Sequence, residues 1–139
     1  MPASPDPFSY AIVRVVPDVE RGESLNAGVI LHCPSRRFLA ARVHLDEPRL
    51  LALAPSASPS QINSWLEAVV TTAEGRNLTA PLANLTQSER FGLLTAPSST
   101  VIQASPVHTG LTDSPEDELR HLFERLVTRR PDRPAEGSS

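Results

Sequence analysis

The chain contains no lysine and only one cysteine, and each scarcity excludes a kind of chemistry. All 13 basic residues are arginine, so a lysine Schiff base and the lysine of a phosphate-binding P-loop are ruled out. The single cysteine, Cys33, cannot form a disulfide within the chain or build a cysteine-based zinc site. Because Cys33 lies in an apolar run, we expect a buried and unreactive thiol.

Aromatic residues and net charge are also low. Aromatic residues make up 4% of the chain and the net charge is −3, a balance that disfavours base stacking and phosphate neutralisation, so nucleic acid is not an expected partner. No apolar run reaches the length of a membrane span, and the first ten residues lack the pattern of a signal peptide. The composition therefore predicts a cytoplasmic protein without a membrane partner.

Metal-binding and catalytic motifs are missing as well. The four histidines are dispersed along the chain without the spacing of metal ligands. Neither the G-x-S-x-G nucleophile elbow nor the H-R-D and D-F-G motifs of kinases occur. We expect no metal and no cofactor, and the sequence favours a non-enzymatic protein without settling the question.

Apolar runs predict the strands of a single domain. The runs span residues 8–16, 27–33, 38–45 and 100–104, and 40% of the 139 residues are hydrophobic, which is enough for one core. β-branched residues occupy both faces of the first run, as in a central strand or one covered on both sides. The segment SPVHTG, at 105–110, is predicted to be a turn.

Capping signals predict the helices. Asp46, Ser58, Thr86 and Ser114 each precede a segment of helical character, as N-cap residues do. In the helix after Ser58, Trp65 falls at helical spacing with the apolar positions, and we expect it in the core.

The element order is therefore β-β-β-α-α-α-β-α. This order predicts an α+β fold, with a small, mainly antiparallel sheet of about four strands and helices packed on one face. We expect an irregular tail at 1–7, one domain at 8–130 and a disordered tail at 131–139.

The connection between the first two strands is the candidate site. It spans about ten residues, longer than a usual hairpin loop, and carries Arg21, Glu23 and Asn26. Arg21 could clamp a carboxylate or phosphate, and Glu23 could act as a base or a metal ligand. Alternatively, the same polar groups and glycines could simply stabilise the loop. For the cluster of Arg21, Glu23 and Asn26 as a whole, the sequence favours neither interpretation over the other.

Further arginines could extend this site. Arg14 interrupts an apolar strand face and needs a counter-charge if it is buried, for which Glu23 across the hairpin is the nearest candidate. Arg42 and Arg90 could converge on the same face, which would leave room for an anionic ligand. The candidate ligand- or partner-binding residues are thus Arg14, Arg21, Glu23, Asn26, Arg42 and Arg90.

The segment from Tyr10 to Val29 has the form Y-x3-R-x2-P-D-x2-R-G-E-x2-N-x-G-V. Downstream, 105–110 reads S-P-V-x-T-G and 119–127 reads L-x2-L-F-x3-V. This pattern resembles the bacterial domain-of-unknown-function family numbered 3037, from about Tyr10 to Val127. The family has no assigned activity. We associate its members with gene neighbours resembling HipA-type kinases, so the resemblance implies a protein partner.

Two hypotheses follow. The first is a small protein-binding or accessory module, in which a sheet edge or an exposed helical stripe contacts the partner. The second is an enzyme or binding protein for a phosphate-bearing or nucleotide ligand, which would use the Arg/Glu/Asn loop. A concave pocket around Arg21 and Glu23 would favour the second, whereas a flat apolar patch, or a Glu23 fully used by Arg14 and backbone amides, would favour the first.

Overall fold

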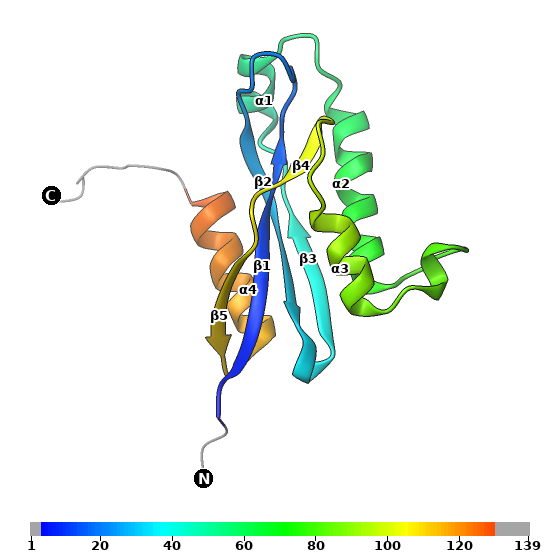
Figure 1. Ribbon diagram of the computed structural model, residues 1–139. Helices are drawn as coiled ribbons and strands as arrows, with labels where there is room; N and C mark the ends of the chain where they lie inside the picture. The colour runs from blue at the N-terminus through cyan, green and yellow to red at the C-terminus, as the bar shows by residue number, and fades with distance from the viewer. Residues whose placement is uncertain (1–3, 130–139) are drawn as a thin grey trace, which may run out of the picture.

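The computed structural model describes residues 4–129 and shows a five-stranded antiparallel sheet with four α-helices, an α+β fold as predicted (Figure 1). The strands are β1 (Asp6–Val15), β2 (Leu25–Cys33), β3 (Phe38–Val43), β4 (Ile102–Ala104) and β5 (His108–Thr112). The helices are α1 (Glu47–Leu53), α2 (Pro59–Glu74), α3 (Gln87–Thr95) and α4 (Pro115–Phe123), and a π-helical turn (Glu124–Thr128) follows α4. The predicted tail at 131–139 lies outside the described residues.

The strand order is β3-β2-β1-β4, and β5 pairs with the same side of β1 as β4 does. Two expectations are corrected here. The first strand begins at Asp6, within the segment expected to be an irregular tail, because Asp6 and Pro7 pair with Thr112 and Leu111. The segment expected to be a turn contains the start of β5, whose register against β1 no local signal reveals.

Ser105 lies between β4 and β5, and it supplies the hydrogen bonds to β1 at the point where the ladder passes from one strand to the other. Its backbone N–H donates to the Ile12 carbonyl at 2.8 Å, and its side-chain oxygen accepts from the Ile12 N–H at 2.8 Å. The Ser105 hydroxyl in turn donates to the Pro106 carbonyl at 2.9 Å. Ser105 is buried, so without this hydroxyl the Ile12 N–H would lack a partner.

Helices cover both faces of the sheet, where the sequence predicted only one. One core, which includes Ile30, Leu66 and Phe91, lies between the sheet and helices α2 and α3. A second core, which includes Leu31 and Leu122, lies between the opposite face and α4 (Figure 1). Successive residues of β2 point to opposite faces, so the continuous apolar run of β2 supplies both cores.

The predicted helix caps are confirmed. The side chains of Asp46, Ser58, Thr86 and Ser114 each accept the backbone N–H three residues ahead. These bonds satisfy N–H groups that have no partner within the first turn of a helix.

Candidate functional site

The β1–β2 connection is a turn built on Asp18. The backbone N–H groups of Arg21 and Gly22 donate to the Asp18 carbonyl, both at 3.1 Å, and the Glu20 N–H donates to the Asp18 carboxylate. Gly22 has a φ of +74°, which glycine adopts without steric cost. These bonds are those of the self-stabilised loop that the sequence left open as one of two alternatives.

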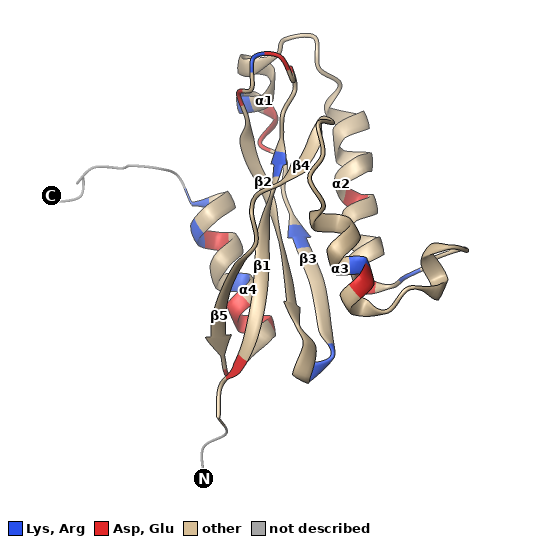
Figure 2. Ribbon diagram, in the orientation of Figure 1, with Lys and Arg blue, Asp and Glu red and all other residues tan. Residues whose placement is uncertain are grey.

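The charged pair of this loop lies in solvent. The Arg21 guanidinium donates to Glu23 Oε1 at 2.9 Å, and the two side chains are 62% and 47% exposed. Figure 2 shows acidic and basic residues next to each other at this end of the hairpin. The hydrogen bond from Arg21 holds the pKa of Glu23 below its ordinary value. The ion pairs within residues 4–129 do not include Arg14 with Glu23, because Glu23 pairs with Arg21 instead.

Asn26 and Gly28, which follow the loop, have structural roles. The Asn26 amide Nδ2 donates to the Leu126 carbonyl, at 3.0 Å, in the π-helical turn after α4. A Cβ on Gly28 would lie 2.8 Å from the Arg42 carbonyl oxygen and 2.8 Å from Val43 Cγ1. β3 can therefore approach β2 closely here only because residue 28 has no side chain.

Arg90 binds the C-terminal end of α2. Its guanidinium donates to the carbonyls of Thr72, Leu85 and Ala73 at 2.9, 3.1 and 3.4 Å. Carbonyls in the last turn of a helix lack the usual intrahelical donor. The Thr72 carbonyl also accepts the Gly75 N–H at 3.3 Å, and Arg90 adds a donor to it and to Ala73. Three of its N–H groups are thus occupied by backbone oxygens.

Arg14 and Arg42 lie on the sheet face that α4 covers. In the sheet, Arg14 stands opposite Asn26 and is half-buried. The Arg42 guanidinium carbon is 5.9 Å from the centre of the Phe123 ring, within the range of a cation–π contact. The four candidate arginines therefore do not share one site, since Arg90 packs against α2 on the other face and Arg21 lies in the exposed loop.

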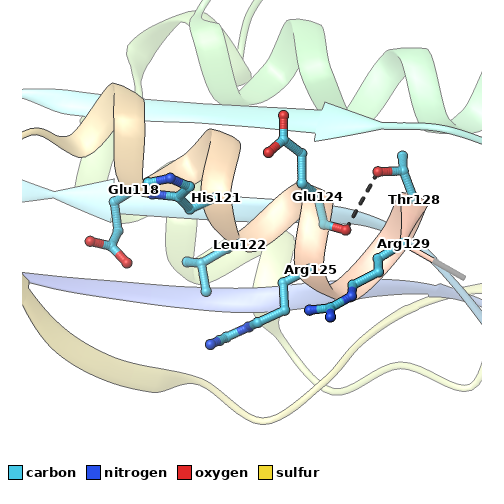
Figure 3. Close-up of a pocket in the computed structure, with 7 residues that line it drawn as sticks. All are labelled: Glu118, His121, Leu122, Glu124, Arg125, Thr128 and Arg129. Carbon is cyan, nitrogen blue, oxygen red and sulfur yellow. Dashed lines mark hydrogen bonds between the residues drawn. The ribbon is translucent and has the colours of Figure 1, made fainter. Parts of the chain in front are cut away.

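A hollow of about 620 Å³ lies along α4 and its π-helical turn (Figure 3). The side chains of Leu122, Arg125 and Arg129 project from the same side of the helix, as Figure 3 shows. Glu118 and Glu124 also line the hollow, so its charges are of both signs. None of the six residues predicted from the sequence lines it.

A second hollow, of about 630 Å³, has a mostly apolar lining, and we call it the Trp65 groove. It is lined by Val19, Trp65, Ala68, Val69, Ser99, Thr100, Val101 and Ile102, which belong to the β1–β2 connection, to α2 and to the segment entering β4. Trp65 is 42% exposed and Val19 is 44% exposed. Trp65 therefore does not lie in the core, contrary to its predicted place.

Helix α2 carries two apolar stripes, although the helical spacing of its apolar residues predicted one. Ile62, Leu66 and Ala73 are buried against the sheet, whereas Trp65 and Ala68 are exposed on another side of the helix. An apolar arc wider than a core-facing stripe was the signal that could have revealed the groove. The contribution of Val19, inside an otherwise polar loop, had no such signal.

Residues 4–129 contain neither a cluster of metal ligands nor a membrane-spanning helix. No group of three or more His, Cys, Asp or Glu side chains there could hold a metal ion. No helix in that part of the chain has the length and apolarity needed to cross a membrane.

A family model described as a protein of unknown function, DUF3037, matches residues 10–127. The match covers the loop, both sheet edges and α4. No curated protein and no solved structure matches the chain.

Proposed function

We propose a protein-binding role for this chain, which belongs to the DUF3037 family. The exposure of Trp65 within an apolar groove carries the proposal. Tryptophan is enriched among the residues that dominate binding energy at protein interfaces, and contiguous apolar surface on a soluble protein often marks a contact site. Covering about 100 Å² of such surface would contribute roughly 2.5 kcal/mol before the costs of association.

The occupant that the groove favours is an amphipathic helix of a partner protein. β4 forms one wall, and an added strand would need its outward backbone groups. The Ile102 carbonyl already accepts the Thr100 hydroxyl at 2.8 Å, and the Thr100 carbonyl accepts the Gln103 amide at 2.8 Å. Contacts here would therefore come from apolar side chains, as when a helix lies in a groove.

The loop supports this assignment. Glu23 is engaged by Arg21, and the Asp18 turn satisfies its own backbone. Val19, at the same turn, extends into the Trp65 groove. The loop thus contributes an apolar contact to the groove and presents its charges at the rim, where interfaces are usually polar.

The test is co-purification from lysate of the native host followed by reconstitution with the identified partner. Ala68→Glu places a charge in the groove at an exposed helical position, so we expect the fold to persist and affinity to fall at least about tenfold. Ala52→Glu, at an exposed position of α1 outside the groove, is the matched control. A purified HipA-type kinase is the first partner to test, because the resemblance implies it.

Trp65 is the chain's single tryptophan, and its fluorescence reports the groove directly. Binding of the purified partner should shift the emission to the blue as water is excluded from the indole. A partner bound equally by wild type and Ala68→Glu, with no change in emission, would refute the groove as the binding surface. The absence of any stoichiometric partner would refute the module.

A phosphate-bearing ligand is the second candidate function, and one observation favours it. Arg125 and Arg129 line the hollow along α4 and project to the same side of the helix (Figure 3). Guanidinium groups in this arrangement suit phosphate oxygens. Thermal-shift measurements with inorganic phosphate and nucleotides test it, and a shift that disappears in Arg125→Gln would support this candidate over the module.

A further inference from the structure

β3 is an edge strand without the proline or bulge that commonly prevents pairing, although it carries Arg42, and Leu39 and Ala41 are only 5% and 4% exposed where they pack in the core with α2. It pairs with β2 on one side only, and no strand within residues 4–129 pairs with the other side. No proline interrupts β3, and its register against β2 runs without a shift from Phe38 to Val43. Prolines and bulges are common devices that block edge pairing. The opposite sheet edge has a proline, because Pro106 lies in the break between β4 and β5.

The hydrogen-bond pattern shows which backbone groups of β3 point outward. The His44 N–H donates to the Ala27 carbonyl at 2.8 Å, so these two residues form a hydrogen-bonded pair. Hydrogen-bonded pairs alternate along an antiparallel ladder. The N–H and C=O groups of Leu39, Ala41 and Val43 therefore point away from β2, at the spacing that an added strand requires.

A charged groove runs along this edge between α2 and α4. Two adjoining hollows, of about 410 and 320 Å³, share Ala41 and Arg42, and we call them together the β3-edge groove. The charged residues of its lining are Glu67 and Glu74 from α2, Glu116, Asp117 and Arg120 from α4, and Arg42 from β3. Four carboxylates against two guanidinium groups leave a net charge of −2.

Two of these carboxylates are available to a ligand. Asp117 pairs with Arg120 at 2.9 Å, and Glu74 pairs with Arg76 at 2.7 Å. Glu67 and Glu116 take part in no ion pair within residues 4–129. They come from the helices on opposite sides of the sheet, α2 and α4.

We propose that the β3-edge groove binds an extended, basic segment of another protein, which adds to the sheet as a strand beside β3. Main-chain bonds to Leu39, Ala41 and Val43 would hold the segment, as in β-strand addition generally. Side chains of a strand alternate between the two sheet faces, so successive basic residues reach Glu67 on one side and Glu116 on the other. The groove shares no residue with the Trp65 groove, so this inference goes beyond the proposed function, and either can fail alone.

The experiment is a nuclear magnetic resonance titration of the isotope-labelled full chain with an eight-residue peptide in which pairs of arginines alternate with pairs of valines, so that arginine side chains lie on both faces of the strand. We expect shifts and slowed amide exchange at Leu39, Ala41 and Val43. A peptide of the same pattern with glutamate in place of arginine should leave these amides unchanged. A basic peptide with N-methyl groups on its pairing edge should bind at least about tenfold more weakly, because it cannot donate to β3.

Protein variants test the role of charge. Glu67→Gln with Glu116→Gln should raise the Kd of the basic peptide about threefold to tenfold, since both groups are exposed and partly screened. Glu118→Gln with Glu124→Gln is the matched control, because it also removes two negative charges but does so in the other hollow.

Three results would overturn the proposal. One is equal binding of the acidic and basic peptides, or of the N-methylated peptide. Another is the absence of binding at millimolar peptide. The third is protection of the same three amides without peptide in a dimer seen by sedimentation, which would assign the edge to a second copy of this chain.

Discussion

The side-chain amide of Asn26 donates a 3.0 Å hydrogen bond to the main-chain carbonyl of Leu126, 100 residues further along the chain. Asn26 lies at the start of β2, directly after the candidate loop, and Leu126 lies in the π-helical turn that follows α4. Carbonyls at the end of a helix lack partners within it, and here a strand residue supplies one. The R-G-E-x2-N-x-G-V motif, which contains Asn26, is thereby connected to the turn after the last helix.

Replacing Asn26 with alanine should loosen that connection. The free energy of unfolding should fall by about 1–2 kcal/mol, because a half-buried carbonyl loses its partner. Urea titration followed by circular dichroism measures the change, and amide exchange should quicken at the end of α4. Asn63→Ala is the control, because the Asn63 amide only reaches Glu47 at 3.5 Å on the surface. Equal losses in both variants would contradict the structural role of Asn26.

Replacing Ser105 with alanine should remove a hydrogen bond inside the sheet. The Ile12 N–H would then have no acceptor in a buried position, and we expect a loss of about 1–3 kcal/mol in the free energy of unfolding. Ser88→Ala, at an exposed position in α3, should have little effect by the same urea titration. If both variants unfold at the same urea concentration, a water molecule or a shift of the strand must satisfy Ile12.

Elements with local signals were predicted from the sequence, and elements defined by distant contacts were not. The caps at Ser58, Thr86 and Ser114 involve residues three positions apart, and all three were identified. β5 was missed because Pro106 and Gly110 suggest a turn, while its pairing partner lies about a hundred residues earlier in β1. The second core was missed because a continuous apolar strand does not say which helix covers which face.

For the candidate site, too, local features were predicted from the sequence and long-range contacts were not. The polar loop was located, but the roles of its residues depend on partners that spacing cannot reveal. Asn26 binds a carbonyl in the last helix, and Arg90 binds the end of α2. Trp65 shares its helical spacing with core residues, and only the packing of α2 shows that it faces outward. A surface is therefore harder to predict than a core, because its residues need no common pattern.

Two glycines should respond to alanine in opposite directions. Gly28→Ala would place a Cβ 2.8 Å from the Arg42 carbonyl oxygen, which is backbone and cannot turn aside, so we expect a loss of about 1–3 kcal/mol. Gly92 lies in α3 with nothing within 4 Å of a new Cβ, and alanine there should stabilise by about 0.5–1 kcal/mol. Thermal unfolding of the two variants checks both signs, and destabilisation by Gly92→Ala would contradict the open space around it.

The last prediction concerns pH. His32 is 6% exposed, and its ring centre lies 5.2 Å from that of Phe91. Burial lowers the pKa of the His32 imidazole below its ordinary value. As the pH falls, the unfolded chain, with a histidine pKa of about 6.5, takes up the proton before the native state does. The stability from a neutral His32 is therefore complete above about pH 6.5 and is lost as the pH falls through that value toward the lower native pKa.

His32→Leu removes this titration and keeps an apolar contact with Phe91. The free energy of unfolding of the wild type should therefore fall more between pH 7.5 and pH 5.0 than that of the variant. Carboxylates held at a lowered pKa, such as Asp6 and Asp117, lose their contribution only at more acidic pH, so they do not confuse the comparison. If the free energy of unfolding changes with pH in the same way in both proteins, protonation of His32 does not destabilise the native state. His32 would then have to leave the Phe91 ring and reach solvent, and amide exchange near α3 would quicken at acidic pH.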